Sequence, residues 1–80
     1  MIIQAIETKY AGPTNTRGSR IVVTAAAGRK SFGYDHALDA TENHRVAARK
    51  YAEALGWLSE GRTLVTGGTK HGYTHVLVNR

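Results

Sequence analysis

Apolar and polar residues alternate along this chain in a pattern that predicts several short strands and one helix. The clearest signal is the segment DATENHRVAARKYAEALG, residues 39–56, where apolar side chains recur with the period of an α-helix. Asp39 is expected to cap the first turn, with Glu42 in the reciprocal position of a capping box. Gly56 should adopt the left-handed conformation that ends many helices, and Trp57 should fold back onto the end of the core.

The helix is predicted to be amphipathic, with small residues on its inner side. At about 100° per residue, one face collects the residues expected in the core: Ala40, His44, Ala47, Ala48, Tyr51, Ala54, Leu55 and Leu58. The opposite ridge carries Glu42, Arg45, Arg49 and Glu53. The alanines should let the helix lie close to a sheet, and His44 on the apolar face is expected to be a hydrogen-bonded core histidine.

The remaining apolar segments are rich in β-branched and aromatic residues and predict strands. They span residues 2–10, 20–26, 30–35, 62–66 and 73–79. The order β-β-β-α-β-β, with connections of hairpin length, predicts an α+β fold: a small antiparallel sheet of about five strands with one helix packed on one face. Residues 1–80 are expected to form a single domain. The uncovered sheet face is a natural docking surface for a partner or a second copy, so a homodimer is one expectation.

Length and composition restrict the class of protein. The 80 residues include no cysteine, which excludes disulfides and thiolate metal sites. The longest apolar run, residues 21–27, is far too short to cross a bilayer, and the amino terminus lacks the basic and apolar regions of a signal peptide. We therefore expect a cytoplasmic protein without a membrane partner.

Charge indicates what the protein binds. The formal net charge is +5, and the excess lies in the strands and loops rather than in the helical third. The turn-rich segment TNTRGSR, residues 14–20, combines two guanidiniums with hydroxyls and free amides, which suits phosphate or carboxylate oxygens. The predicted partner-binding residues are Arg17, Arg20, Arg29 and Lys30, strand and loop cations expected to gather in one patch, and, as a second possible contact ridge, Arg45 and Arg49. For the last two, a solvated surface helix is an equally good interpretation, because glutamates flank them.

Two segments superficially suggest catalysis or a cofactor. Asp35, His36 and His44 lie near the helix start, where a carboxylate beside an imidazole could orient a general base or hold a metal. Helix capping and core closure explain the same residues more simply. The glycine-rich residues 67–72, GGTKHG, are followed by a strand, whereas a phosphate-binding P-loop leads into a helix. We therefore predict no catalytic residue, no cofactor, no metal and no enzymatic activity.

Four aromatic residues leave two interpretations open. Tyr10, Phe32, Tyr34 and Tyr73 could stack on bases if they lined an open sheet face, as in proteins that bind single strands. Packing in the core is the alternative, and it is the usual role of aromatics in a small domain.

Two stretches, IIQAIETKYAGPTNTRGSRI and YDHALDATENHRVAARKYAEALGW, resemble a family of small uncharacterised proteins encoded by bacteriophages and prophages. The resemblance covers roughly the first sixty residues and implies a viral accessory protein, located in the cytoplasm of a bacterial host. In size and architecture such a chain is also similar to anti-CRISPR proteins, which commonly occupy a surface of the host effector complex. Many of those inhibitors are acidic mimics of DNA, which a chain of charge +5 cannot be.

The sequence thus predicts a phage-encoded anti-defence inhibitor that binds a host defence ribonucleoprotein, such as a CRISPR effector complex, and blocks it sterically without catalysis. The alternative is a basic nucleic-acid-binding accessory protein of phage replication or regulation, which would use the same loops on phosphates.

Overall fold

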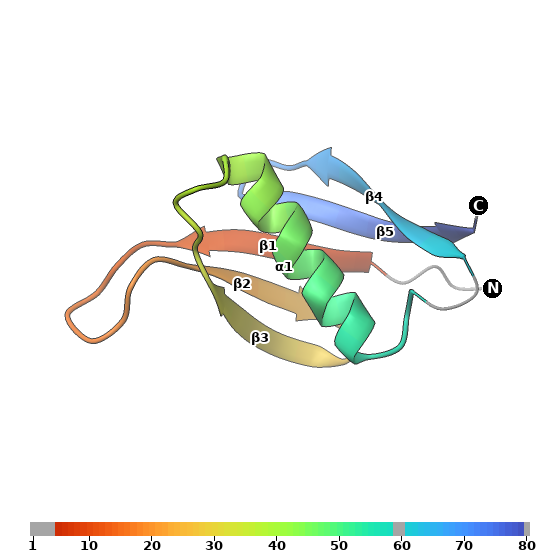
Figure 1. Cartoon of the computed structure of the whole chain (residues 1–80), viewed down its shortest axis with the longest axis horizontal. Helices are drawn as coiled ribbons and strands as arrows, with labels where there is room; N and C mark the ends of the chain where they lie inside the picture. Colours follow the sequence, from red (N-terminus) through yellow and green to blue (C-terminus); the bar gives the residue numbers. More distant parts are fainter. Residues whose placement is uncertain (1–4, 59–60, 80) are drawn as a thin grey trace.

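The protein is described here by a computed structural model, covering residues 5–58 and 61–79. Five strands form one antiparallel sheet in the order β3-β2-β1-β5-β4, and one helix follows β3 in the chain (Figure 1). The elements are β1 (Ala5–Ala11), β2 (Arg20–Ala25), β3 (Gly28–Gly33), α1 (Ala40–Ala54), β4 (Arg62–Gly68) and β5 (Tyr73–Asn79). The predicted α+β class, the element order and the single helix are confirmed.

Some strand boundaries differ from those predicted. The turn between β2 and β3 is tighter than expected, because Gly28, at a φ of 128°, already pairs with Ala25. β3 therefore begins and ends two residues earlier than predicted. β4 continues through Gly68, two residues beyond the predicted end. The first residues of the predicted first strand, 2–4, lie outside the described residues.

The core lies between α1 and one face of the sheet. Its buried residues are Ile6, Ile21 and Val23 from the strands and Ala47, Ala48, Tyr51 and Ala52 from the helix. The alanines allow the close approach expected from the sequence. Trp57 packs edge-to-face on Tyr51, with 5.9 Å between ring centroids, and so closes the end of the core as predicted.

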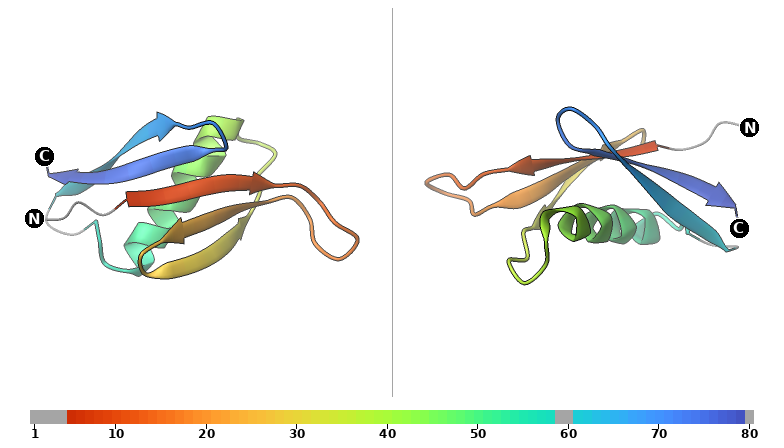
Figure 2. Two further views of the ribbon diagram at one scale, coloured as in Figure 1. Left: turned by 180° about the vertical axis from the view of Figure 1, so that it is seen from behind. Right: turned by 90° about the horizontal axis from the view of Figure 1, so that it is seen from above.

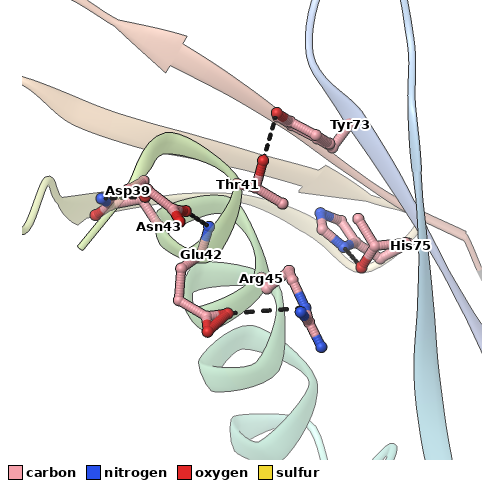
Figure 3. Close-up of polar contacts among 8 residues, drawn as sticks. Asp39, Thr41, Glu42, Asn43, Arg45, Tyr73 and His75 are labelled. Atoms are coloured by element: carbon pink, nitrogen blue, oxygen red, sulfur yellow. Dashed lines mark hydrogen bonds and ion pairs between the residues drawn. The ribbon is translucent and has the colours of Figure 1, made fainter.

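Asp39 and Gly56 cap the two ends of α1 as the sequence predicts, but the described residues show no reciprocal capping-box bond from Glu42, whose carboxylate lies beside Arg45 instead. The Asp39 carboxylate accepts the Glu42 N–H at 2.8 Å (Figure 3). At the other end Gly56 has a φ of 73°, and the Trp57 N–H reaches the Ala52 carbonyl at 2.9 Å. That pattern is a Schellman motif, which satisfies carbonyls that the helix leaves free.

The buried side of α1 differs from the prediction at several positions. Ala40, Ala54 and Leu55 are exposed, whereas Ala52 and the polar Asn43 are buried. Asn43 is buried because its side chain supplies hydrogen-bond partners to the backbone of the segment before the helix. Its Oδ1 accepts the Asp35 N–H at 2.8 Å, and its Nδ2 donates to the carbonyls of Asp35, Leu38 and Asp39 at 2.9–3.2 Å.

Replacing Asn43 with alanine is expected to lower the free energy of unfolding by about 2–3 kcal/mol, because buried backbone groups would lose their partners. Urea denaturation followed by circular dichroism measures the change. Lys50→Ala, an exposed change on the same helix, is the control and should stay within about 0.5 kcal/mol of the parent. If the two variants were equally stable, the hydrogen bonds of the Asn43 side chain would not stabilise the fold.

Candidate nucleic-acid interface

The sheet has one face turned away from α1, which we call the open face (Figure 2). Paired residues on neighbouring antiparallel strands point to the same side, and successive residues alternate. Ile6, Thr8 and Val23 are buried under α1. Their neighbours Glu7 and Lys9 therefore lie on the open face. Arg29 joins them, because it pairs with Thr24, which in turn pairs with Glu7.

A hollow of about 450 Å³ occupies part of the open face. It is bordered by β1, β2, the start of β3 and the loop of residues 69–72. Three cationic side chains, Lys9, Arg29 and Lys70, line it from three different segments. Two hydroxyl side chains (Thr24, Thr69) and His71 also contribute, and Glu7 is the one carboxylate among the described lining residues. Cations and hydroxyls grouped in this way suit the oxygens of phosphate.

The loop of residues 69–72 forms one wall of the hollow. It rises on the side of the sheet away from α1 (Figure 2, right). The Thr69 N–H donates to the Gly72 carbonyl at 2.8 Å, which closes the turn. Gly72 lies directly on the backbone of Thr8, where any side chain would meet the Thr8 carbonyl. This contact holds Lys70 beside β1.

Charge is distributed unequally between the two sides of the molecule. Among the described acids, four lie on α1 or on the segment before it: Asp35, Asp39, Glu42 and Glu53. The open face carries Lys9, Arg20, Arg29 and Lys70 beside one carboxylate, that of Glu7. The open face is therefore the most uniformly basic surface among the described residues.

The predicted single patch of strand and loop cations is wrong, because its members lie on different surfaces. Arg29 and Lys30 are successive residues of β3 and point to opposite faces. Lys30 lies on the helix side, with its Nζ 5.5 Å from the centroid of the Phe32 ring. Arg45 and Arg49 line a separate cleft between α1 and β4. Strand alternation, which moves successive side chains to opposite sides, is the physical reason.

Arg17 and Arg20 are close in sequence, but their side chains lie in different environments. Arg17 is exposed in the loop between β1 and β2, where its N–H donates to the Thr14 hydroxyl oxygen at 3.0 Å. Arg20, the first residue of β2, is half-buried, and its Nε and Nη1 are buried without a hydrogen-bond partner among the described residues. Neither residue lines the hollow.

Lys9 and Lys70 line the hollow but were not among the predicted binding residues. Alternation from buried Ile6 would have placed Lys9 outward, so that signal was present in the sequence. The position of Lys70 depends on how the 69–72 loop curves over β1, which the glycine-rich sequence does not specify.

The four aromatic residues do not form a stacking surface on the open face. Phe32 pairs with buried Ile21, and Tyr73 pairs with buried Thr8, so both lie on the helix side. The Tyr73 hydroxyl is 3.0 Å from the Thr41 Oγ1 on α1 (Figure 3). Tyr10 and Tyr34 pack edge-to-face, with centroids 5.4 Å apart. Base stacking on the open face is therefore wrong, and the packing interpretation holds for Phe32 and Tyr34, which pack against the core.

The residues considered for catalysis have separate partners. The Asp35 carboxylate accepts the Ala37 N–H at 2.9 Å, and the exposed His36 ring packs on Tyr34. His44 is buried, with its Nδ1 2.7 Å from the Thr8 Oγ1, as expected of a core histidine. No group of three or more metal-ligating side chains occurs among the described residues.

A second histidine, His75, is fully buried and was not predicted to be in the core. Its Nε2 is 2.9 Å from the Thr8 Oγ1, and its Nδ1 is 2.9 Å from the Thr66 Oγ1. Burial, and then the nearby His44 and Arg45, lower the pKa of His75 to about 4. Burial also lowers the pKa of His44. The two imidazoles and two hydroxyls form a polar chain inside the core.

Comparisons with protein-family models, with curated proteins and with solved structures found no match to this chain. Within the described residues, no helix is long and apolar enough to span a membrane.

Proposed function

We propose that this chain is a non-catalytic protein that binds the phosphate backbone of a nucleic acid on the open face of its sheet. The observation that supports the proposal is the convergence of Lys9, Arg29 and Lys70 on one hollow, where the described lining residues include a single carboxylate. Of the two functions predicted from the sequence, this is the nucleic-acid-binding accessory protein.

The chemistry of the hollow favours phosphate over bases. Lysine ammoniums act as point charges and the arginine guanidinium can donate two parallel hydrogen bonds, and both match phosphate oxygens. Thr24 and Thr69 add hydroxyl donors. The rings of Phe32 and Tyr73, which could stack on bases, lie on the helix side of the sheet. We therefore expect weak sequence preference and a strong dependence on salt.

Fluorescence anisotropy with labelled RNA and with single- and double-stranded DNA, each of about 20 nucleotides, tests this at about 150 mM salt. The triple variant Lys9→Glu, Arg29→Glu, Lys70→Glu should weaken binding at least about tenfold. It should also flatten the dependence of log K on log salt by about 2–3, since each phosphate contact contributes about 0.7–0.9.

The matched control carries the same change in charge on the opposite side of the molecule. In Arg45→Glu, Arg49→Glu, Arg62→Glu the open face is unaltered, so nucleic-acid binding should weaken far less. If both triple variants lose binding equally, only net charge matters and the assignment of the open face is wrong. If the parent chain binds none of the probes, the proposed function is wrong.

The anti-defence inhibitor predicted from the sequence resemblance stays a prediction. The two functions differ in one measurable way. An inhibitor would bind a CRISPR effector complex without binding free nucleic acids. A pull-down from a CRISPR-bearing host, run with the parent and the two triple variants, separates the two functions. Retention of the effector complex without nucleic-acid binding would replace the proposed function by the inhibitor.

A further inference from the structure

The opposite side of the molecule carries a second hollowed surface, along β4. Helix α1 packs mainly on β1 and β2, with a smaller contact to β5, and β4 lies beyond the helix at the edge of the sheet (Figure 1). A cleft of about 370 Å³ lies between α1 and β4. A second hollow of about 300 Å³ continues it toward the other end of β4 and shares Arg45, Leu64 and Thr66 with it.

Together these hollows form what we call the α1–β4 trough, which follows the inner side of β4 from Arg62 to Gly68. At about 3.3 Å per residue, this is roughly 20 Å, the length of a typical strand. Val46, Leu58 and Leu64 provide apolar surface within it. The trough is therefore long and narrow, suited to an extended chain.

Arginines dominate the charge of the trough. Arg45 and Arg49 come from successive turns of α1, and Arg62 is the first residue of β4. Two carboxylates, Glu42 and Glu53, also line it. Glu42 is 3.8 Å from the Nε of Arg45 in an exposed pair (Figure 3). Arg49 and Arg62 form no ion pair with any described residue.

The outer edge of β4 is not protected against pairing. Its central residues, Thr63 to Thr66, include three β-branched residues and carry neither charge nor proline, whereas the other edge strand, β3, carries Arg29 and Lys30. Edge strands of natural proteins are usually blocked by charge, proline or a covering element. Within the described residues, no strand pairs with the outer edge of β4.

We propose that an extended acidic segment of a partner protein adds to β4 as a sixth strand, with alternate carboxylate side chains directed into the α1–β4 trough. The backbone ladder supplies affinity and the alternate side chains supply selectivity. An acidic residue opposite Arg62 forms a favourable cross-strand pair, and a second meets Arg49. A second copy of this chain fits less well, because its own β4, RTLVTGG, contains no carboxylate.

A labelled peptide of four Thr-Glu repeats, with a Thr-Lys peptide of equal length, tests this proposal by fluorescence anisotropy. The acidic peptide should bind and the basic one should not. Amide hydrogen exchange should slow at the β4 amides that face away from β5. Two further Thr-Glu peptides, one N-methylated at every Thr and the other at every Glu, keep the charge but each lose the ladder donors of one strand edge, so one of the two should bind at least about tenfold more weakly.

The variant Arg49→Glu, Arg62→Glu should weaken peptide binding at least about tenfold. Lys50→Glu, an exposed neighbour of Arg49 that does not line the trough, is the control and should bind like the parent. The open-face variant Lys9→Glu, Arg29→Glu, Lys70→Glu should also bind the peptide normally, so this test is independent of the proposed function.

Several results would overturn the proposal. They are equal binding of the acidic and basic peptides, undiminished binding of both N-methylated peptides, equal loss in Lys50→Glu, or slowed exchange confined to the open face. Sedimentation that shows a dimer, with β4 amides already protected in the absence of peptide, would assign the edge to a second copy.

Discussion

Lowering the pH from 7 to 5 is expected to destabilise this fold through the buried His75. In the folded protein its pKa is lowered to about 4, whereas an unfolded histidine has a pKa of about 6.5. Between these values the unfolded state binds more protons than the folded state. The stability contributed by neutral His75 is therefore complete above about pH 6.5 and is lost as the pH falls toward 4, by about 3 kcal/mol at most.

The geometry around His75 explains why it resists protonation. The Thr8 hydroxyl lies between two imidazoles, 2.9 Å from His75 Nε2 and 2.7 Å from His44 Nδ1. It can donate its one hydrogen to one ring while accepting from the other, so both rings are satisfied when neutral. If both rings were protonated, the Thr8 oxygen would face two donors. The two positive charges, with Arg45 nearby, would repel one another in the core.

Urea denaturation at pH 7, 6 and 5 measures this contribution, in a range above the ordinary pKa values of carboxylates. His75→Gln should be less stable than the parent at pH 7 but should lose less stability on acidification. His36→Gln, a change of an exposed histidine, should keep the pH dependence of the parent. An unchanged pH dependence in His75→Gln would show that His75 does not carry the effect.

The sequence was sufficient to predict the elements because each carries its own local signal. Asp39 and Gly56 mark the ends of α1 through hydrogen bonds within a few residues, and the structure confirms both. Local chemistry also placed His44 in the core.

Burial in β5 could not be predicted, because it depends on residues far away in the chain. In YTHVLVN both alternating sets contain apolar residues, so either face could have been the inner one. His75 is buried because it pairs with Ile6 of β1, which is covered by α1. A polar residue inside the core was possible only because Thr8 and Thr66 are present as partners.

The candidate interface was only partly predictable for a related reason. Arg29 was expected to bind a partner, and it lines the hollow on the open face. Lys30, beside it in sequence, points to the opposite side. Positive charge along a sequence does not indicate which face of a strand each residue occupies until the inner residues are known. Lys9 and Lys70 meet only after β1 and the 69–72 loop are brought together by the fold.

Replacing Gly72 with alanine is expected to lower the free energy of unfolding by about 3 kcal/mol, the largest effect we predict for adding one methyl group. A Cβ at Gly72 would fall on the carbonyl oxygen of Thr8, which belongs to the backbone of the central strand β1. Neither partner is a flexible side chain, so the 69–72 loop must move away from β1. Thermal and urea denaturation measure the loss.

The same change tests how the loop contributes to the proposed interface. Once the loop has moved, Lys70 no longer borders the hollow beside Lys9, so folded Gly72→Ala should bind nucleic acid about as weakly as Lys70→Ala. Gly68→Ala, in the same hairpin, is the matched control: no atom lies within 4 Å of its added Cβ, and it should stay within about 0.5 kcal/mol of the parent. If Gly72→Ala were as stable as Gly68→Ala and bound nucleic acid like the parent, the 69–72 loop would not be held by β1, and its lysine would have no fixed place in the hollow.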